Sequence, residues 1–339
     1  MFTATCPVSG VHSRSKMSDV DDMIGYYDKT YCSVGQWFLE PAKTIVLGQT
    51  TDQACRFCGK RAPGVTFDLV AHAIPESLGN KNLLSAYECD SCNRLFGSSI
   101  ENDFGNWSKP MRTFARIRGK NGVPTLKKDS RGGWRIEYGL TGFKIEQYEA
   151  DPISEINEKE RQITFQLRRD PFTPVAVLKA FVKMGLSVMP DAEMRSFSHA
   201  LRWIRNTDHR VGLVSEFPIL YSFIPGPMAN DKIVLLLFRR RDGIEDVPYA
   251  FFILSYGNEV FQVYLPSPKR DHTIHGKQLQ LMPFPHPNDI SPSGYGSVQR
   301  RVLNLTGLDV VKGEIVTLTM GFERAETDLA ASDEAAGSS

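Results

Sequence analysis

Four of the six cysteines stand in two pairs whose spacing suits metal binding. Two residues separate the cysteines of each pair, in Cys55-Arg-Phe-Cys58 and in Cys89-Asp-Ser-Cys92. Two such knuckles can place four thiolates around one tetrahedral Zn²⁺, and Gly59 lets the first knuckle turn back on itself. Four sulfur ligands leave no open position, so we expect a structural zinc rather than a catalytic one. The alternative is a set of buried free thiols or disulfides.

The interval between the two pairs is too long for a simple zinc ribbon. It holds 30 residues, whereas a ribbon has ~15–20. An apolar stretch runs from Val65 to His72, a loop with Pro and Gly follows, and a second apolar stretch starts at Asn82-Leu83-Leu84. We therefore predict two short strands, the second knuckle and a helix from Asp90 onward, stapled together by zinc.

These motifs together resemble the HNH endonucleases, which are zinc-stapled ββα-metal nucleases. The resemblance covers roughly residues 50–107 and combines several residue types in a fixed order. The residues that carry it are the two cysteine pairs, Ala71-His72-Ala73-Ile74-Pro75-Glu76-Ser77-Leu78-Gly79, Asn82-Leu83, Cys92-Asn93, and then Phe96-Gly97 with Ile100-Glu101.

The resemblance implies a role for three residues. His72 would be the general base that takes a proton from the attacking water, and a neutral imidazole near pH 7 suits that role. Asn82 would brace the loop after the first strand and orient the histidine. Asn93 would bind one catalytic divalent ion, for which oxygen ligands and a substrate phosphate favour Mg²⁺ or Mn²⁺.

One expected ligand of the catalytic ion is missing. Family members commonly have Asp or Glu before the histidine, whereas this chain has Ala71. Glu101 is the first candidate to supply the carboxylate. On an unbroken helix it would lie ~12 Å beyond Asn93, so we expect a bend near Gly97. The alternatives are Asp90 and Glu76, or a solvated Glu101 with no ligand role.

A strongly basic segment follows the nuclease motif. Nine basic residues against the single acid Asp129 give residues 109–135 a net charge of +8, in a chain whose net charge is only +1. Contacts between such residues and phosphates add affinity that is independent of sequence. On a strand, residues 112, 116 and 118 would share one face. The predicted nucleic-acid contacts are Arg112, Arg116, Arg118, Lys127, Lys128 and Arg131, and the alternative is a solvated hairpin without a ligand.

Two further segments of the chain follow the cysteine-rich region. Residues 108–170 contain short β segments, the first at 113–119. Residues 171–325 begin with helices at 174–189 and at 191 to about 205, and continue with strands at 233–238, 249–254, 259–265 and 314–322. We predict an α+β fold: an N-terminal extension (1–50, partly disordered), the HNH domain (51–107), a basic β-rich segment (108–170), an α+β domain with an antiparallel sheet (171–325), and a disordered acidic tail (326–339).

Composition limits the function classes. Hydrophobic residues make up 41% of the 339-residue chain, which is ample for a core. We expect no membrane span, because no apolar run approaches ~20 residues, and no secretory signal, because the N-terminus has no apolar core.

The sequence thus predicts a cytoplasmic bacterial endonuclease that hydrolyses DNA with His72 as general base, in a defence system by analogy with its family. Residues 171–325 would regulate or target it, through a protein partner or a small-molecule trigger. The alternatives are a non-catalytic zinc-stapled module that binds nucleic acid, and an RNA- or tRNA-directed nuclease.

Overall fold

The computed structural model describes residues 16–128, 133–140, 142–147, 152–212, 218–277, 279 and 281–322. Its largest feature is a six-stranded sheet in which all neighbouring strands are antiparallel. The strand order is β1 (Tyr31–Leu39), β10 (Ile233–Arg240), β11 (Ala250–Tyr256), β12 (Glu259–Leu265), β9 (Pro218–Phe223) and β13 (Gln299–Asn304). Strands β11 and β12 are buried along almost their whole length, which explains why they are apolar at nearly every position.

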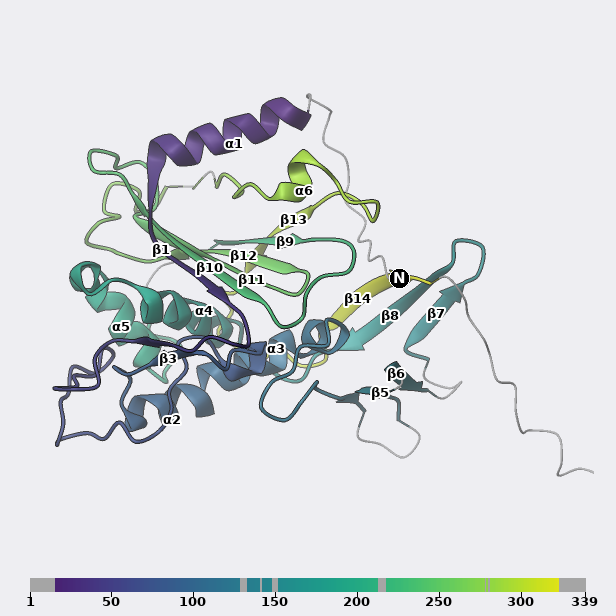
Figure 1. Cartoon of the computed structure of the whole chain (residues 1–339), viewed down its shortest axis with the longest axis horizontal. Helices are drawn as coiled ribbons and strands as arrows, with labels where there is room; N and C mark the ends of the chain where they lie inside the picture. The colour runs from purple at the N-terminus through teal and green to yellow at the C-terminus, as the bar shows by residue number, and fades with distance from the viewer. Residues whose placement is uncertain are drawn as a thin grey trace, which may run out of the picture.

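Helices cover both faces of this sheet (Figure 1). Helix α1 (Lys16–Thr30) and the short α6 (Pro287–Ile290) lie on one face, and α4 (Pro174–Val188) and α5 (Ser198–Arg205) lie on the other. Helix α4 is buried from Val175 to Val188, because it contacts α5, the sheet strand β12 and helix α3 (Ile100–Phe114). Gly185 permits the close approach of the sheet, since a Cβ there would lie only 2.7 Å from Phe252.

The cysteine-rich region packs against α4. It contains β2 (Ile45–Leu47), which runs parallel to β3 (Leu83–Ser85), the 3₁₀ turn η1 (Glu76–Leu78), helix α2 (Asp90–Ser98) and helix α3. One hydrophobic core extends from this region into the sheet. Phe104 and Trp107 of α3 contact the ring of Phe181 in α4, and Phe181 in turn contacts Phe261 of β12.

Two small antiparallel sheets project to one side of the large sheet (Figure 1). One has β4 (Leu126–Lys127), β5 (Arg135–Gly139) and β6 (Gly142–Glu146), and the other has β14 (Ile315–Gly321), β8 (Gln162–Arg168) and β7 (Ser154–Asn157). They share a second hydrophobic cluster. Phe114, the last residue of α3, joins the two sheets because its ring contacts both Phe143 of β6 and Phe165 of β8.

The predicted fold class, an α+β chain with an antiparallel sheet, is confirmed. The helix predicted at 174–189 is α4, and the next helix is a 3₁₀ segment (Asp191–Phe197) followed by α5. Three of the predicted strands are β10, β11 and β12. No helix within the described ranges has both the length and the apolar character that crossing a membrane requires.

Four local predictions are corrected by the structure. Residues 31–47, which we assigned to an extension, contribute β1 and β2. The strand at 113–119 is wrong, because α3 continues to Phe114. The strand at 65–72 is reduced to one bridge between His72 and Leu84. The strand predicted at 314–322 pairs with β8 rather than with the large sheet. The tails at 1–15 and 323–339 lie outside the described residues.

Candidate active site and metal centre

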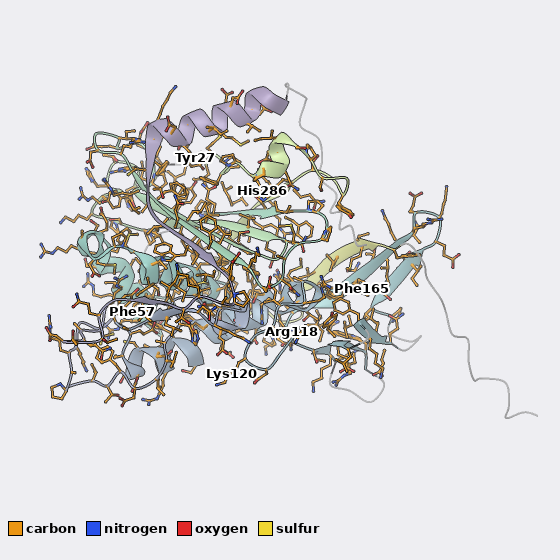
Figure 2. All side chains as sticks on the ribbon, viewed as in Figure 1. Tyr27, Phe57, Arg118, Lys120, Phe165 and His286 are labelled. Carbon is orange, nitrogen blue, oxygen red and sulfur yellow. The ribbon has the colours of Figure 1, made fainter. Side chains whose placement is uncertain are left out.

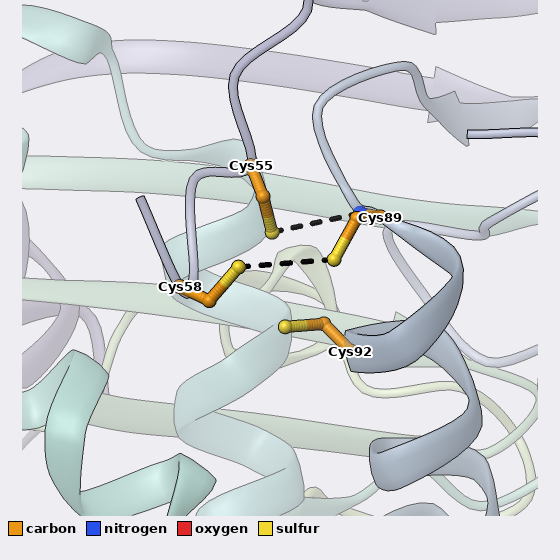
Figure 3. Close-up of side chains that lie close together, drawn as sticks. All are labelled: Cys55, Cys58, Cys89 and Cys92. Atoms are coloured by element: carbon orange, nitrogen blue, oxygen red, sulfur yellow. Dashed lines mark hydrogen bonds between the residues drawn. The ribbon is translucent and has the colours of Figure 1, made fainter. Parts of the chain in front are cut away.

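The four paired cysteines point toward a common centre (Figure 3). Their sulfur atoms all lie within 4.8 Å of one another, and those of Cys58 and Cys89 are 3.8 Å apart. A tetrahedral Zn²⁺ with Zn–S bonds of ~2.3 Å separates its sulfur ligands by about 3.8 Å, so this cluster could hold zinc. All four are free cysteines, which removes the disulfide alternative. A side-chain hydrogen bond with Cys92 lowers the pKa of Cys55 and raises that of Cys92, so Cys55 is the thiol that ionises most readily.

Arg56, inside the first knuckle, ties the cluster to helix α4. Its guanidinium lies 3.8 Å from the centre of the Tyr87 ring and pairs with Asp191 at 2.5 Å. Its Nη1 also donates hydrogen bonds of 2.7–3.0 Å to the carbonyl oxygens of Leu186, Ser187 and Met189. These acceptors surround the C-terminal end of α4, where a cation is favoured by the helix dipole. No local sequence pattern indicates this contact, because Asp191 and the end of α4 lie far along the chain from Arg56.

Asp90, an alternative ligand for the catalytic ion, is used by the loop before His72. One carboxylate oxygen accepts a 2.6 Å hydrogen bond from the Thr66 hydroxyl, and the other accepts a 2.9 Å bond from the Leu69 amide. The bond from Thr66 is the main reason that the pKa of Asp90 is lowered. Because both oxygens are engaged, Asp90 stabilises the loop instead of offering a free carboxylate.

His72 lies in an extended segment beside β3. The Ala73 amide donates to the Leu83 carbonyl at 3.1 Å, and the Ser85 amide donates to the Ala71 carbonyl at 2.9 Å. The side chain is half-buried. Burial lowers the pKa of His72, the charge of Glu76 opposes this, and Lys183 reinforces it. The imidazole is therefore neutral at pH 7, as a general base requires.

The loop after His72 is braced by Asn80 rather than by Asn82. Asn80 is buried, and its amide nitrogen donates to the carbonyls of Ile74 and Leu83 at 2.7 and 3.1 Å. Its side-chain oxygen accepts from the amides of Asn82 and Leu83. The side chain of Asn82 instead donates to the Glu40 carbonyl at 2.7 Å. Sequence reasoning missed Asn80, although Asn in a Gly-Asn turn is a recognisable signal.

Asn93 lies on α2 and faces the segment that leads to His72. Its amide nitrogen is 3.5 Å from the Val70 carbonyl, which is a long hydrogen bond. This bond uses the nitrogen of the side chain and does not involve its oxygen. The predicted bend near Gly97 is present, because α2 ends at Ser98 and α3 begins at Ile100.

Glu101 belongs to a buried ionic cluster. Lys183 Nζ, on α4, lies 3.0 Å from Glu101 Oε1, 3.1 Å from Glu88 Oε2 and 3.0 Å from the carbonyl oxygen of His72. Burial opposes the positive charge, but the two carboxylates raise the pKa of Lys183. Burial also raises the pKa of Glu88 to about 7. Sequence reasoning missed Lys183 and Glu88, whose partners are distant in the chain.

The residues predicted for the catalytic ion offer only a partial shell. Among the described residues, the four cysteines are the only group of three or more His, Cys, Asp or Glu side chains close enough to share an ion. One oxygen of Glu101 already pairs with Lys183. Asn93 and Glu101 carry the oxygen donors that an ion such as Mg²⁺ accepts, since Mg²⁺ usually binds one or two carboxylates and completes its coordination shell with waters and substrate phosphate.

The structure separates the predicted nucleic-acid contacts into two groups. Arg112 is buried, and its guanidinium donates to the Ser108 hydroxyl and to the Ser77 and Gly105 carbonyls, so it is a structural residue. The other described members, Arg116, Arg118, Lys127 and Lys128, are exposed. Arg131 lies outside the described residues.

Arg116 and Arg118 follow the end of α3 directly. Arg116 has a left-handed backbone (φ 57°), and the Ile117 amide bonds back to the Arg112 carbonyl, as in a Schellman motif. Together with Lys81 they line a pocket of about 330 Å³ that also contains Asn80 and Asn82. Figure 2 places Arg118 and Lys120 on the side of the large sheet that carries the cysteine-rich region.

Similarity to known proteins is confined to the cysteine-rich region. No curated protein and no solved structure showed significant similarity to the chain. Residues 55–108 match the HNH endonuclease family. The match begins at the first cysteine of the metal cluster and includes His72, Asn93 and Glu101. The chain is therefore similar to the HNH endonucleases over residues 55–108, which lie within a larger α+β fold.

Proposed function

We propose that this protein is a metal-dependent endonuclease that hydrolyses phosphodiester bonds in DNA, with His72 as the general base. The observation that carries the proposal is the position of His72 within the HNH region: its imidazole is half-buried, and burial keeps it neutral at pH 7. A neutral imidazole can accept a proton from the attacking water, and general-base catalysis contributes typically ~10²–10⁴-fold.

The residues around His72 have supporting roles in this proposal. Asn80 fixes the loop that follows the histidine. The Asn93 side-chain oxygen and Glu101 are the candidate ligands of the divalent ion. When bound, Mg²⁺ or Mn²⁺ would polarise the phosphoryl group and stabilise the leaving 3′ oxygen. The products would then carry 5′-phosphate and 3′-hydroxyl ends, as in the family.

The cysteine cluster has a structural role in the proposal. Four sulfur ligands within 4.8 Å of one another suit Zn²⁺ and leave it no open position for water or substrate. The ion would join the knuckle at Cys55 to the start of α2, and so fix α2 beside the His72 segment.

The exposed basic residues give a path for the DNA backbone. Arg116 and Arg118 lie beside the loop after His72, and the charge of Lys120 lowers the pKa of His72, so it also lies near the site. These side chains recognise phosphate, which favours binding with little sequence specificity.

We assign residues 171–325 a regulatory or targeting role. We place the enzyme in bacterial cytoplasmic defence because HNH nucleases of this layout often act there.

The direct test is cleavage of supercoiled plasmid in Mg²⁺, Mn²⁺ or EDTA, with wild-type protein beside His72→Ala. We expect metal-dependent nicking that the variant loses while its melting temperature is unchanged. Parallel assays with single-stranded RNA and tRNA identify the substrate class. Cleavage of RNA alone would replace the DNA assignment, and DNA binding without cleavage in any divalent ion would indicate a non-catalytic module.

The zinc assignment has a separate test. Cys89→Ser should lower the zinc content and the melting temperature, because zinc binding is part of the folding free energy. Cys32→Ser is the control, since Cys32 lies on β1 and bonds to the Arg239 carbonyl, away from the cluster. Equal zinc content and stability in the two variants would contradict a structural zinc.

A further inference from the structure

We propose that Lys183 is a positioning residue of the nuclease site: its ammonium group, supplied by a helix outside the HNH region, fixes the His72 backbone and the Glu101 carboxylate relative to each other. The inference rests on the proposed nuclease function and adds a dependence of catalysis on helix α4. Lys183 lies well beyond the matched residues 55–108.

The ammonium group of Lys183 donates a hydrogen bond to the His72 carbonyl and forms ion pairs with the Glu88 and Glu101 carboxylates. An ammonium has three N–H donors and no acceptor. Lys183 Nζ has three oxygen neighbours, the His72 carbonyl at 3.0 Å, Glu101 Oε1 at 3.0 Å and Glu88 Oε2 at 3.1 Å. The three oxygens come from three different segments of the HNH region. One buried group thus joins the candidate general base, a candidate metal ligand and the residue before the second knuckle.

The side chain of Lys183 is buried and is bordered by two aromatic rings. Its side chain is 2% exposed, that of Glu88 is 0% exposed and that of Glu101 is 19% exposed. The rings of Phe57 and Phe96 lie 5.8 and 5.6 Å from the ammonium. In such surroundings the attraction between opposite charges is screened weakly. Of the two carboxylate side chains, only that of Glu101 is partly exposed.

Helix α4 is a rigid base for this group. Every residue from Val175 to Val188 is buried, and Phe181 packs between α3 and the large sheet. The C-terminal end of α4 is fixed by Arg56, and the Tyr87 hydroxyl donates to the Ser187 carbonyl. A site supported by packed helices holds its geometry more closely than a site on loops alone. The His72 segment pairs with β3 at Leu84, and the carbonyl of His72 accepts a hydrogen bond from Lys183.

Loss of the ammonium would release both groups. Glu88 and Glu101 would become unpaired carboxylates in one buried space and would repel each other. The His72 carbonyl would lose its hydrogen-bond donor. We therefore expect the chemical step to slow, because a misplacement of the base by about 1 Å can cost ~10²-fold in rate.

Lys179 is a natural control on the same helix. It lies one turn before Lys183 and is equally buried. Its ammonium donates to the Asn206 carbonyl at 2.7 Å and lies 3.1 Å from His209 Nδ1. These partners belong to the segment after α5 and none is in the HNH region. Lys179→Met therefore removes a buried charge from α4 without touching the nuclease site.

The experiment compares kcat and KM for plasmid nicking in wild type, Lys179→Met, Lys183→Met and the double variant Lys183→Met/Glu88→Gln. The double variant removes one charge of each sign, so it retains the fold if Lys183→Met alone unfolds. Zinc content and melting temperature are measured for each. We expect Lys183→Met and the double variant to lose about 10²-fold in kcat with unchanged KM. Lys179→Met should keep the wild-type kcat.

Three results would overturn the inference. Wild-type kcat in a folded Lys183→Met or double variant would show that the ammonium has no positioning role, while the nuclease function stands. An equal loss of kcat in Lys179→Met would show a general effect of α4 stability. A wild-type protein that cuts no nucleic acid would refute the nuclease function itself, and this inference with it.

Discussion

The guanidinium of Arg56 lies 3.8 Å from the centre of the Tyr87 ring, stacked between the first cysteine knuckle and the end of helix α4. Both residues also bond to backbone carbonyls of α4, Arg56 to Leu186 and Tyr87 to Ser187. The contact is therefore more than a local stack. It holds the cysteine cluster in a fixed position against helix α4.

Replacing Arg56 with Met should destabilise the whole protein. The change leaves the carbonyls of Leu186 and Met189 without their donor, while the Ser187 carbonyl keeps the Tyr87 hydroxyl, and we expect the loss to cost about 3 kcal/mol in the free energy of unfolding. Denaturant unfolding followed by fluorescence measures the loss. Arg61→Met is the matched control, because Arg61 is exposed and its ion pair with Asp52 should be worth less than about 1 kcal/mol. Equal stabilities of the two variants would contradict this role.

Asn80 and Asn82 should respond very differently to the same change. Asn80→Ala removes a buried amide that bonds to four backbone groups, so we expect a loss of about 3 kcal/mol in stability. Asn82→Ala removes one exposed bond to Glu40 and should change stability by less than about 0.5 kcal/mol. Thermal unfolding of the two variants is the measurement. The reverse order would restore the bracing role to Asn82.

The pH dependence of cleavage should report His72. Burial lowers the pKa of this imidazole, and only the neutral form accepts a proton. The cleavage rate should therefore not vary with pH around pH 7. It should fall as the pH drops through the pKa of His72, which lies below 6.5. The charged groups around it are Glu76 and Glu101, which raise the pKa, and Lys183 and Lys120, which lower it.

Two substitutions should shift the acid limb of the pH–rate profile, where the rate falls with falling pH, in opposite directions. Glu76→Gln removes a negative charge, so the pKa falls and the limb moves to lower pH. Lys120→Met removes a positive charge, so the pKa rises and the limb moves to higher pH. Shifts of the same sign in both variants would show that another group controls the profile.

The exposed Arg118 and the buried Arg112 should differ in their effect on DNA binding. Arg118→Gln should weaken binding and reduce the slope of log K against log salt by about 1, as expected for one lost phosphate contact. Arg112→Gln should leave that slope unchanged and lower the stability instead, because Arg112 is buried against backbone carbonyls. Fluorescence anisotropy over a range of salt concentrations measures the slope. An unchanged slope for Arg118→Gln would remove it from the DNA path.

The parts of the fold that follow from local patterns could be predicted from the sequence. Four cysteines at a two-residue spacing predict a shared centre, and the apolar period between Pro174 and Val188 predicts α4. Helix α3 was harder, because Pro110 stands inside it and proline usually ends a helix. The shared parity of residues 112, 116 and 118 predicts one face of a strand instead, whereas Arg112 is buried on the helix.

The ionic cluster around Lys183 depends on tertiary contacts that no local pattern reveals. A lysine in an apolar helix usually extends its charged end to solvent. Lys183 does not, because Glu88 and Glu101 enter the same buried space from a distant part of the chain. Asn80 was missed for a related reason: its importance comes from its burial, which Asn82, two residues later, does not share.

The hydrophobic core that extends from Phe57 and Phe104 to Phe181 and Phe261 bears on proteolysis. A protease that cut the chain between α3 and α4 would sever one covalent link, but the two fragments would remain bound through the shared core and through Arg56 and Lys183. The fragment that carries residues 55–108 could leave only by exposing its apolar side to water. Cleavage of the backbone between α3 and α4 would therefore not release residues 55–108 as a free fragment.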